Sequence, residues 1–432
     1  MGRTNDLSSN LFYNLMKSGV KISESIPKLE KSNGVKMRNL WSQIIMNLVH
    51  GFGFSAFNIV LQPYIYTFTG ESLLYTGTII SISNVMQFLP MPLIGLLSDK
   101  YGIKTIWLFG PPIFAFGLMI LVFSNSIPIF ILGILIYVLG AMVNSLNFQI
   151  FVSENSGGSK KGILYGLVFF AYFGGAIGGA FFVMLNLVSN SRVYFLIFSI
   201  ILVIEWLILI FIIRTPNHSN LIHVQEDSES TDLIQKKSPK LFQNSKIKTA
   251  TFFFAFDVFV WGIVLSVYNA GLKANYNFSE ANIAFIVLWF QISNMVTQIP
   301  AGRIADKIGR KKCLIISQLF GMVFFSMNVV VSILWSQGIT LFLFPGLIIG
   351  QIFFGIAVTT FIPSEQMTLT NLDENRKAFS YGIVTFIRGI GMLPTGAIGG
   401  FLAESINYTA PFIIGLFGLV IEIWFLAKFF KD

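Results

Sequence analysis

The chain has 432 residues, of which 54% are apolar and only 11% are charged, and its mean hydropathy is +0.73. Because so few polar side chains cannot cover the surface of a soluble globule of this size, the composition excludes a soluble protein and predicts an integral membrane protein. The single cysteine, Cys313, excludes an internal disulfide framework and a cysteine-built metal site. The net charge is +9, but in a membrane protein the positions of the charges carry more information than their sum.

Twelve apolar runs follow a polar, basic tail that covers residues 1–40. In this tail Leu7, Leu11 and Leu15 recur at helical spacing, which predicts either a short helix on the membrane surface or an unstructured tail. Each run has roughly 20 residues or more, enough to cross a ~30 Å hydrocarbon core. The first six lie near 41–66, 73–97, 105–124, 127–152, 162–187 and 193–213, and the second six near 249–272, 281–302, 312–335, 339–363, 378–402 and 409–429.

The two sets of runs predict two six-helix bundles. The first bundle covers 41–213, and the second, with a short tail, covers 249–432. Residues 214–248 between them are polar and charged, which is typical of a flexible linker.

A ten-residue motif occurs once in each set, after its second run. It begins at Gly95 and again at Gly302, 207 residues later, and reads Gly, two residues, a small residue, Asp, Lys, any residue, Gly, any residue, Lys. The matched positions are Gly95, Asp99, Lys100, Gly102 and Lys104 in the first copy, and Gly302, Asp306, Lys307, Gly309 and Lys311 in the second. Two such hairpins half a chain apart predict an internal duplication.

Basic residues predict the orientation of the chain. If the N-terminus is cytoplasmic, all of the 29 Lys and Arg residues except Arg192, Lys273 and Arg388 fall on the cytoplasmic side or in its tails. This asymmetry predicts a multi-pass cell membrane protein with both termini in the cytoplasm.

Further matches support the repeat. Gly-Ala-Ile-Gly-Gly occurs at 175–179 and again at 396–400, and these small residues allow helices to approach closely. Val-Ile-Glu ends at Glu205 in the sixth run and at Glu422 in the twelfth, and we interpret both acids as interfacial or packing residues.

Twelve spans in two related sets, with this hairpin after the second and eighth, resemble the major facilitator superfamily of secondary transporters. The resemblance implies an all-α membrane fold of two pseudo-symmetric six-helix bundles around a central cavity. It also implies that Asp99 and Asp306 cap neighbouring helix ends and join basic residues in a latch that closes the cytoplasmic side. Its other implied members are Lys100, Lys104, Lys307, Arg310, Glu154 and Glu365. The alternative is that the hairpins only obey the positive-inside rule.

Three ionisable residues lie about nine to eleven residues into a span, ~14–16 Å deep at 1.5 Å per residue. They are His50, Asp257 and Arg388. Asp257 follows His50 by 207 residues, so the two occupy equivalent places and are expected to face one cavity. We predict that Asp257 exchanges a proton or competes for Arg388 with an anionic solute. The alternative is a permanent Asp257–Arg388 pair that fixes helix packing. For His50, proton coupling and simple hydrogen bonding are both open.

Amide and aromatic side chains in other spans predict a cavity for a moderately polar organic solute. Asn147, Gln291, Asn294 and Trp261 are candidate lining residues, and Asn84, Gln87, Asn144 and Gln298 accompany them. For any one amide, a hydrogen bond between helices is the alternative.

No Gly-Lys dipeptide occurs, so the phosphate loop of ATP-driven transporters is absent, and no enzymatic activity or cofactor is expected. The sequence predicts a monomeric secondary transporter of a small organic solute, proton-coupled and working by alternating access in the lipid bilayer, without nucleic acid. Its nearest resemblance is to the drug and small-metabolite branches, which favours efflux. The alternatives are proton-coupled uptake of a sugar or organic anion, and a non-transporting sensor or assembly partner on the same scaffold.

Overall fold

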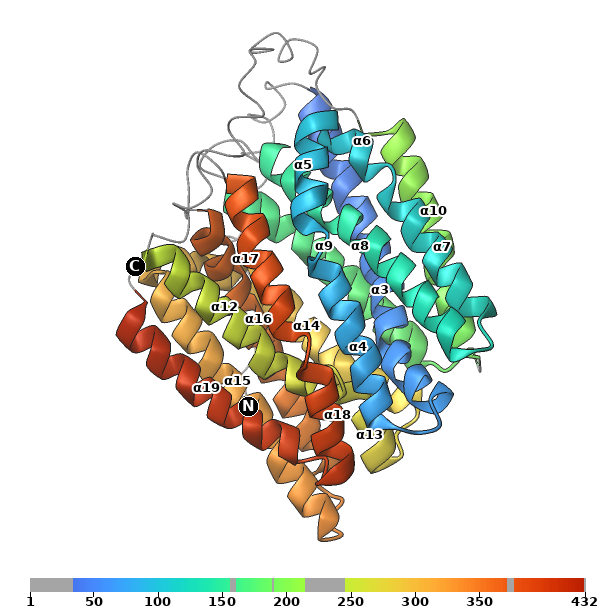
Figure 1. Ribbon diagram of the computed structural model, residues 1–432, viewed down its shortest axis with the longest axis vertical. Helices are drawn as coiled ribbons and strands as arrows, with labels where there is room; N and C mark the ends of the chain where they lie inside the picture. The colour runs from blue at the N-terminus through green and yellow to red at the C-terminus, as the bar shows by residue number, and fades with distance from the viewer. Residues whose placement is uncertain (1–33, 156–160, 189, 214–244, 371–376, 431–432) are drawn as a thin grey trace, which may run out of the picture.

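The computed structural model describes residues 34–155, 161–188, 190–213, 245–370 and 377–430, and within these ranges all regular structure is helical (Figure 1). The first half contains α3 (Gly34–Phe68), α4 (Leu73–Phe88), α5 (Met91–Tyr101), α6 (Ile103–Trp107), α7 (Gly110–Phe123), α8 (Ile127–Asn155), α9 (Lys161–Met184) and α10 (Arg192–Phe211). The second contains α12 (Ser245–Leu265), α13 (Tyr268–Tyr276), α14 (Glu280–Ile308), α15 (Arg310–Ser336), α16 (Leu343–Thr370), α17 (Lys377–Met392), α18 (Thr395–Ser405) and α19 (Ala410–Phe429). The predicted surface helix of the tail and most of the predicted linker lie outside the described residues.

Twelve of the described segments are long and apolar enough to cross a membrane, which confirms the predicted number of spans. Four spans are each built from two helices: α4 with α5, α6 with α7, α12 with α13, and α17 with α18. Two of these breaks lie at Pro90 and Pro394, because proline has no backbone N–H for the helical ladder. Hydropathy did not reveal the breaks, since they leave the apolar run intact.

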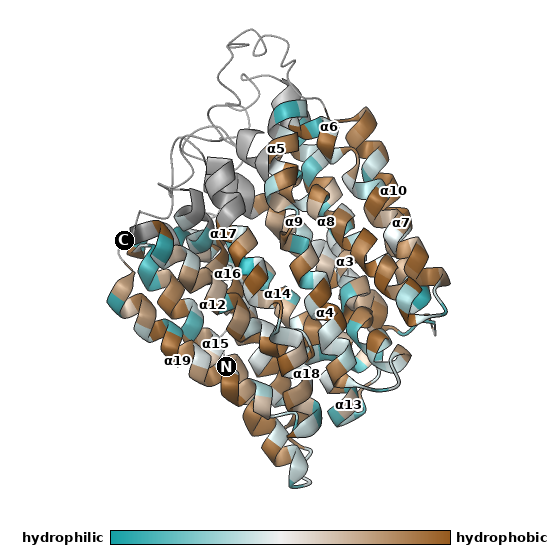
Figure 2. Ribbon diagram, in the orientation of Figure 1, coloured by the Kyte–Doolittle hydropathy of each residue, from teal (hydrophilic) through white to brown (hydrophobic). Residues whose placement is uncertain are grey.

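The two halves lie side by side, blue to green and yellow to red in Figure 1, and Figure 2 shows that hydrophobic residues dominate their helices. They meet mainly through α9 against α14 and through α4 against α18. Gly77 and Gly396 bring α4 and α18 so close that a Cβ on Gly396 would lie 2.0 Å from the Gly77 carbonyl oxygen. Gly175 and Gly179 instead pack against α3 of their own half, so only one of the two glycine motifs holds the halves together.

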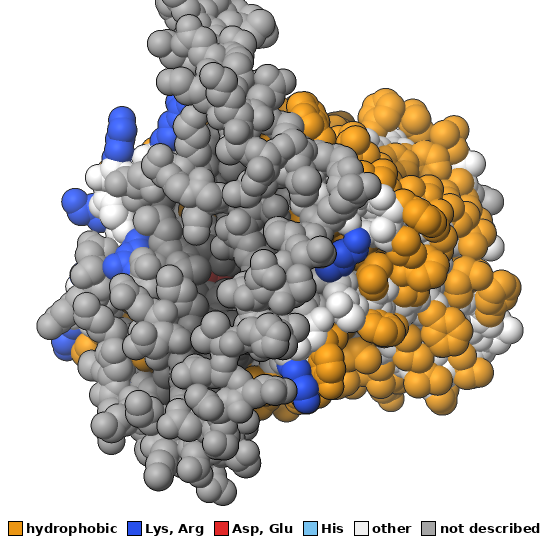
Figure 3. All heavy atoms as spheres, turned by 90° about the horizontal axis from the view of Figure 1, so that it is seen from above, with side chains coloured by type: hydrophobic (Ala, Val, Ile, Leu, Met, Phe, Trp, Pro, Cys, Tyr) orange, Lys and Arg blue, Asp and Glu red, His pale blue; other side chains and the backbone are white. Residues whose placement is uncertain are grey.

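The two ends of the bundle differ in charge and in packing. We call the end that contains the turns at Gly102 and Gly309 the hairpin end, and the end that contains residues 69–72 and 406–409 the opposite end. Gly102 has a φ of +88° and Gly309 a φ of +87°, a conformation that favours glycine. Figure 3, viewed onto the hairpin end, shows Lys and Arg side chains around the face and apolar side chains along the flank.

Hydrogen bonds between the halves gather at the opposite end. Lys273 Nζ donates to Thr67 Oγ1 at 3.0 Å, and Ser191 Oγ donates to Glu280 Oε1 at 2.6 Å. Glu404 Oε2 accepts from the hydroxyl of Ser72 and from the amide of Leu74. The described residues therefore tie the halves together at this end, which is the outer end in the predicted orientation.

Candidate functional site

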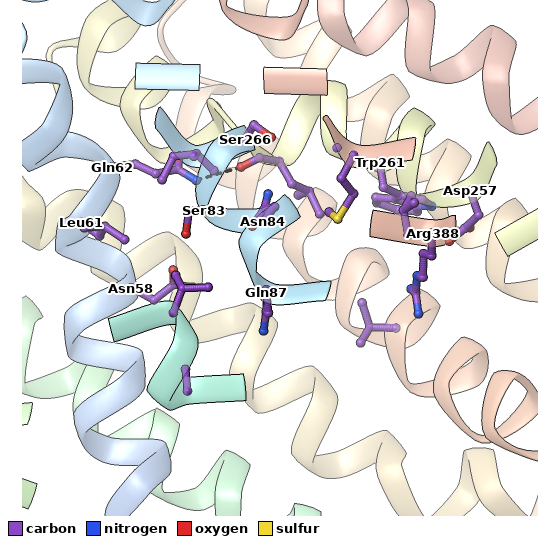
Figure 4. A pocket seen from close by; sticks show the side chains of 18 of the residues that line it. Asn58, Leu61, Gln62, Ser83, Asn84, Gln87, Asp257, Trp261, Ser266 and Arg388 are labelled. Atoms are coloured by element: carbon purple, nitrogen blue, oxygen red, sulfur yellow. Dashed lines mark hydrogen bonds between the residues drawn. The ribbon is translucent and has the colours of Figure 1, made fainter. Parts of the chain in front are cut away.

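A cavity of about 450 Å³ lies between the halves, a size that suits a small organic molecule. Figure 4 shows polar residues of the first half on one side of it and charged and aromatic residues of the second half on the other. Its polar and charged lining residues include Asn58, Gln62, Ser83, Asn84, Gln87, Tyr137, Asp257, Trp261, Ser266, Ser317, Glu365 and Arg388.

Three charged residues of the second half form one cluster on the cavity wall. Arg388 of α17 pairs with Glu365 of α16. Asp257 of α12 is only 4% exposed, and its Oδ1 accepts a hydrogen bond of 2.8 Å from Gln318 Nε2. Arg388 acts on Asp257 electrostatically, but its described ion pair is with Glu365. The expected direct pair between Asp257 and Arg388 is therefore replaced by a three-membered cluster.

Glu365 occupies a different place from the predicted one. It was expected in the latch at the hairpin end, yet it lines the cavity beside Arg388 and is 5% exposed. The physical reason is that the half-buried guanidinium of Arg388 is stabilised by an anionic partner, and Glu365 supplies it from the adjacent helix. The Nε of Arg388 is buried and has no hydrogen-bond partner among the described residues.

The first half contributes mainly amides. Asn84 and Gln87 line the cavity as predicted, whereas Asn58 and Gln62 were not singled out from the sequence. Gln62 donates to the carbonyl of Leu265 at 2.8 Å and accepts from the amide of Asn269 at 2.9 Å. These backbone groups are freed by the break between α12 and α13. The i, i+4 spacing of Asn58 and Gln62 on one helix face was the available signal.

Trp261 forms the aromatic wall predicted for it. Its ring stacks on Phe354 with centroids 5.2 Å apart and on Phe324 with centroids 6.1 Å apart, and both Trp261 and Phe354 line the cavity. Such a wall offers a flat apolar surface to one face of a solute.

Four predicted site residues do not line the cavity. His50 Nδ1 lies 2.9 Å from Glu205 Oε1, among aromatic rings that include Phe54 and Phe198. Asn147 accepts from Ser98 Oγ at 2.7 Å, which ties α8 to α5. Gln291 and Asn294 are buried in α14, and their side-chain oxygens have no partner among the described residues. The predicted cavity role of these four residues thus has no support in the geometry.

Glu205 and Glu422 are more deeply buried than the predicted interfacial acids would be. They are 1% and 0% exposed, and both face the inside of their own half. The predicted packing role fits Glu205, which is held by His50.

The predicted latch is described only in part. The side chains of Asp99, Asp306 and Glu154 lie outside the described residues, so their roles stay predictions. Lys100 and Lys307 are exposed at the hairpin end, Lys104 Nζ donates to the carbonyl of Ile213, and Arg310 is half-buried. Gly95 and Gly302 lie inside α5 and α14 with open space around them.

Comparison with known proteins gave one family and several similar folds. The family model of the Major Facilitator Superfamily matches residues 44–271 and 249–432. Among solved structures, the nucleoside transporter NupG is 18% identical with a TM-score of 0.69, covering 93% of this chain and 100% of its own. The D-xylose-proton symporter is 14% identical with a TM-score of 0.69, covering 91% and 98%. The human organic anion transporter MFSD10 is 14% identical with a TM-score of 0.64, covering 91% and 100%. No curated protein matches the sequence.

Proposed function

Since the chain belongs to the major facilitator superfamily, we propose that it is a proton-coupled secondary transporter of a small, polar organic solute. The observation that supports this function is the cavity between the halves, with amides on one wall and the Asp257, Glu365 and Arg388 cluster on the other. Alternating access requires a site that both halves build, because motion of one half against the other then exposes it to each side in turn.

The lining favours a solute that carries several hydrogen-bonding groups and one flat face. The amides of Asn58, Asn84 and Gln87 can each donate and accept, and Trp261 supplies a stacking surface. The guanidinium of Arg388, whose side chain is 22% exposed and lines the cavity, adds a positive charge that attracts a carbonyl, hydroxyl or carboxylate oxygen. Nucleosides, sugars and organic anions have these features, and the similar solved structures are a nucleoside transporter, a D-xylose-proton symporter and an organic anion transporter.

Proton coupling is proposed from the charges of the site. Glu365 and Asp257 share one guanidinium, so the ionised cluster has one negative charge more than Arg388 can neutralise. A buried excess charge is unfavourable, and binding a proton removes it. Proton-coupled export requires the proton and the solute to bind in turn, whereas proton-coupled uptake requires them to bind together. Whether the proton and the solute compete for the site therefore decides the direction of transport. We propose export, with proton-coupled uptake as the second candidate because a solved symporter shares the fold.

Transport into proteoliposomes with a trapped pH dye tests the proposal. Uridine, D-xylose and benzoate are added in turn to vesicles that contain the wild type, Asp257→Asn or Asn294→Ala, the last as a control for a buried polar residue outside the cavity. We expect proton movement with one probe class, loss of it in Asp257→Asn, and its retention in the control. Wild-type transport without any proton movement would overturn the coupling. No transport of any probe would favour the sensor alternative.

A further inference from the structure

A buried glutamate joins the last helix to the first helix in each half of the protein. Glu205 of α10 faces α3, and Glu422 of α19 faces α12, and both follow the same Val-Ile pair in the sequence. They are 1% and 0% exposed. Because α3 and α12 begin their halves and α10 and α19 end them, the two glutamates hold equivalent places in the repeat.

The partners of the two glutamates differ in charge. His50 lies 2.9 and 3.1 Å from the two carboxylate oxygens of Glu205, so a cation or an N–H donor satisfies that acid. Asp257 stands 207 residues after His50 and takes its place in the second half. Glu422 therefore faces another carboxyl group across α12 and α19, and each of the two acids acts electrostatically on the other. Neither oxygen of Glu422 has an ordinary hydrogen-bond partner among the described residues.

Two ionised carboxylates cannot both be stable at this place. Repulsion between like charges and the loss of water both disfavour the doubly ionised pair. Two charged groups act on Asp257 from neighbouring helices: Arg388 of α17 and Glu365 of α16, which form an ion pair with each other. From α15, the amide of Gln318 donates a hydrogen bond to Asp257. Arg388 thus acts on Glu365 and Asp257, while the described residues supply no cation for Glu422.

We propose that Asp257 and Glu422 form a single proton-binding site, in which the O–H of one carboxylic acid donates to the carboxylate of the other. This inference rests on the proposed proton coupling and adds Glu422 as the second carboxyl group of the site. Asp257 lines the cavity and Glu422 does not, so the proton enters and leaves through Asp257. Glu422 is a positioning residue, which holds the proton beside the cavity while the solute site changes sides.

Infrared difference spectroscopy of the purified protein in lipid tests the site with protons as the only probe. Between acidic and alkaline buffer, we expect the wild type to lose the carbonyl band of a protonated carboxylic acid. Glu422→Gln and Asp257→Asn should each remove or shift this band. Glu205→Gln, the matched buried glutamate of the other half, should leave it in place. Bands that are identical in the wild type and in Glu422→Gln would overturn the proposal.

Transport separates this inference from the proposed function. In Glu422→Gln the proton has only one carboxylate to bind, and the glutamine amide stabilises the ionised form of Asp257. The acid side of the pH profile of proton-driven transport should therefore move to lower pH by about one unit, tenfold in proton concentration. Glu422→Asp should move the profile part of the way back. Exchange of the transported probe without a pH gradient reports on folding and should persist. A pH profile equal to that of the wild type would refute the shared site while leaving proton coupling intact, whereas a wild type without proton-driven transport would refute the proposed function itself.

Discussion

Replacing Gln62 with alanine should weaken the contact between the two halves, so that the opposite end opens more often. One side-chain amide of the first half bonds two backbone groups of the second, the Leu265 carbonyl at 2.8 Å and the Asn269 amide at 2.9 Å. A net hydrogen bond is worth about 0.5–1.5 kcal/mol, so the two together contribute about 1–3 kcal/mol. Gln62 is only half-buried, so in the variant water can replace part of this hydrogen-bond free energy. We expect the free energy that favours the closed opposite end to fall by about 1–2 kcal/mol, which changes the ratio of closed to open molecules about 5–30-fold.

Distances between spin labels across the opposite end measure this change. Labels at Ser126 and Asn407 are exposed and lie in different halves, and the only native cysteine, Cys313, is buried. Gln62→Ala should increase the population at long distances. Gln62→Glu keeps the acceptor for the Asn269 amide but places a carboxylate oxygen against the Leu265 carbonyl oxygen, so it should also increase the population at long distances.

Asn58→Ala serves as the control for the spin-label experiment. It lies one turn away on the same helix, lines the same cavity, and has no hydrogen bond to the other half among those described. Its distance distribution should match that of the wild type. If Gln62→Ala also matched the wild type, the two hydrogen bonds would not hold the halves closed, and the reasoning would fail.

Three further substitutions test other parts of the structure. Arg388→Gln leaves the buried Glu365 unpaired, which lowers stability by about 3–5 kcal/mol in a fully buried pair. The loss should be smaller here because Arg388 is 22% exposed. Thermal unfolding in detergent should show the lower stability, and the double variant with Glu365→Gln should regain most of it. Gly102→Ala places a side chain at a φ of +88°, so it should lower stability by about 1–3 kcal/mol in the same assay. Gly396→Val cannot fit against the Gly77 carbonyl, so the spin labels at the opposite end should move apart or the protein should fail to fold.

The number of spans and the duplication could be predicted from the order of the residues. Each depends on one-dimensional information: the length of an apolar run and the recurrence of a motif. The 207-residue offset pairs His50 with Asp257, and it also pairs Gln62 with Asn269, whose amide donates to Gln62. It did not reveal that one equivalent residue faces the cavity while the other is covered by aromatic rings.

The partners of the charged residues depended on how the helices turn and pack. Asp257 and Arg388 were matched by depth alone, but the rotation of α16 brings Glu365 to Arg388, and α19 brings Glu422 to Asp257. In a soluble helix an apolar stripe shows which face is buried. In these helices apolar residues surround the whole circumference, because both lipid and neighbouring helices accept them, so the sequence carries little information on which face points inward. Packing between helices therefore selected Asn58 and Gln62 for the cavity and directed Asn147, Gln291 and Asn294 away from it.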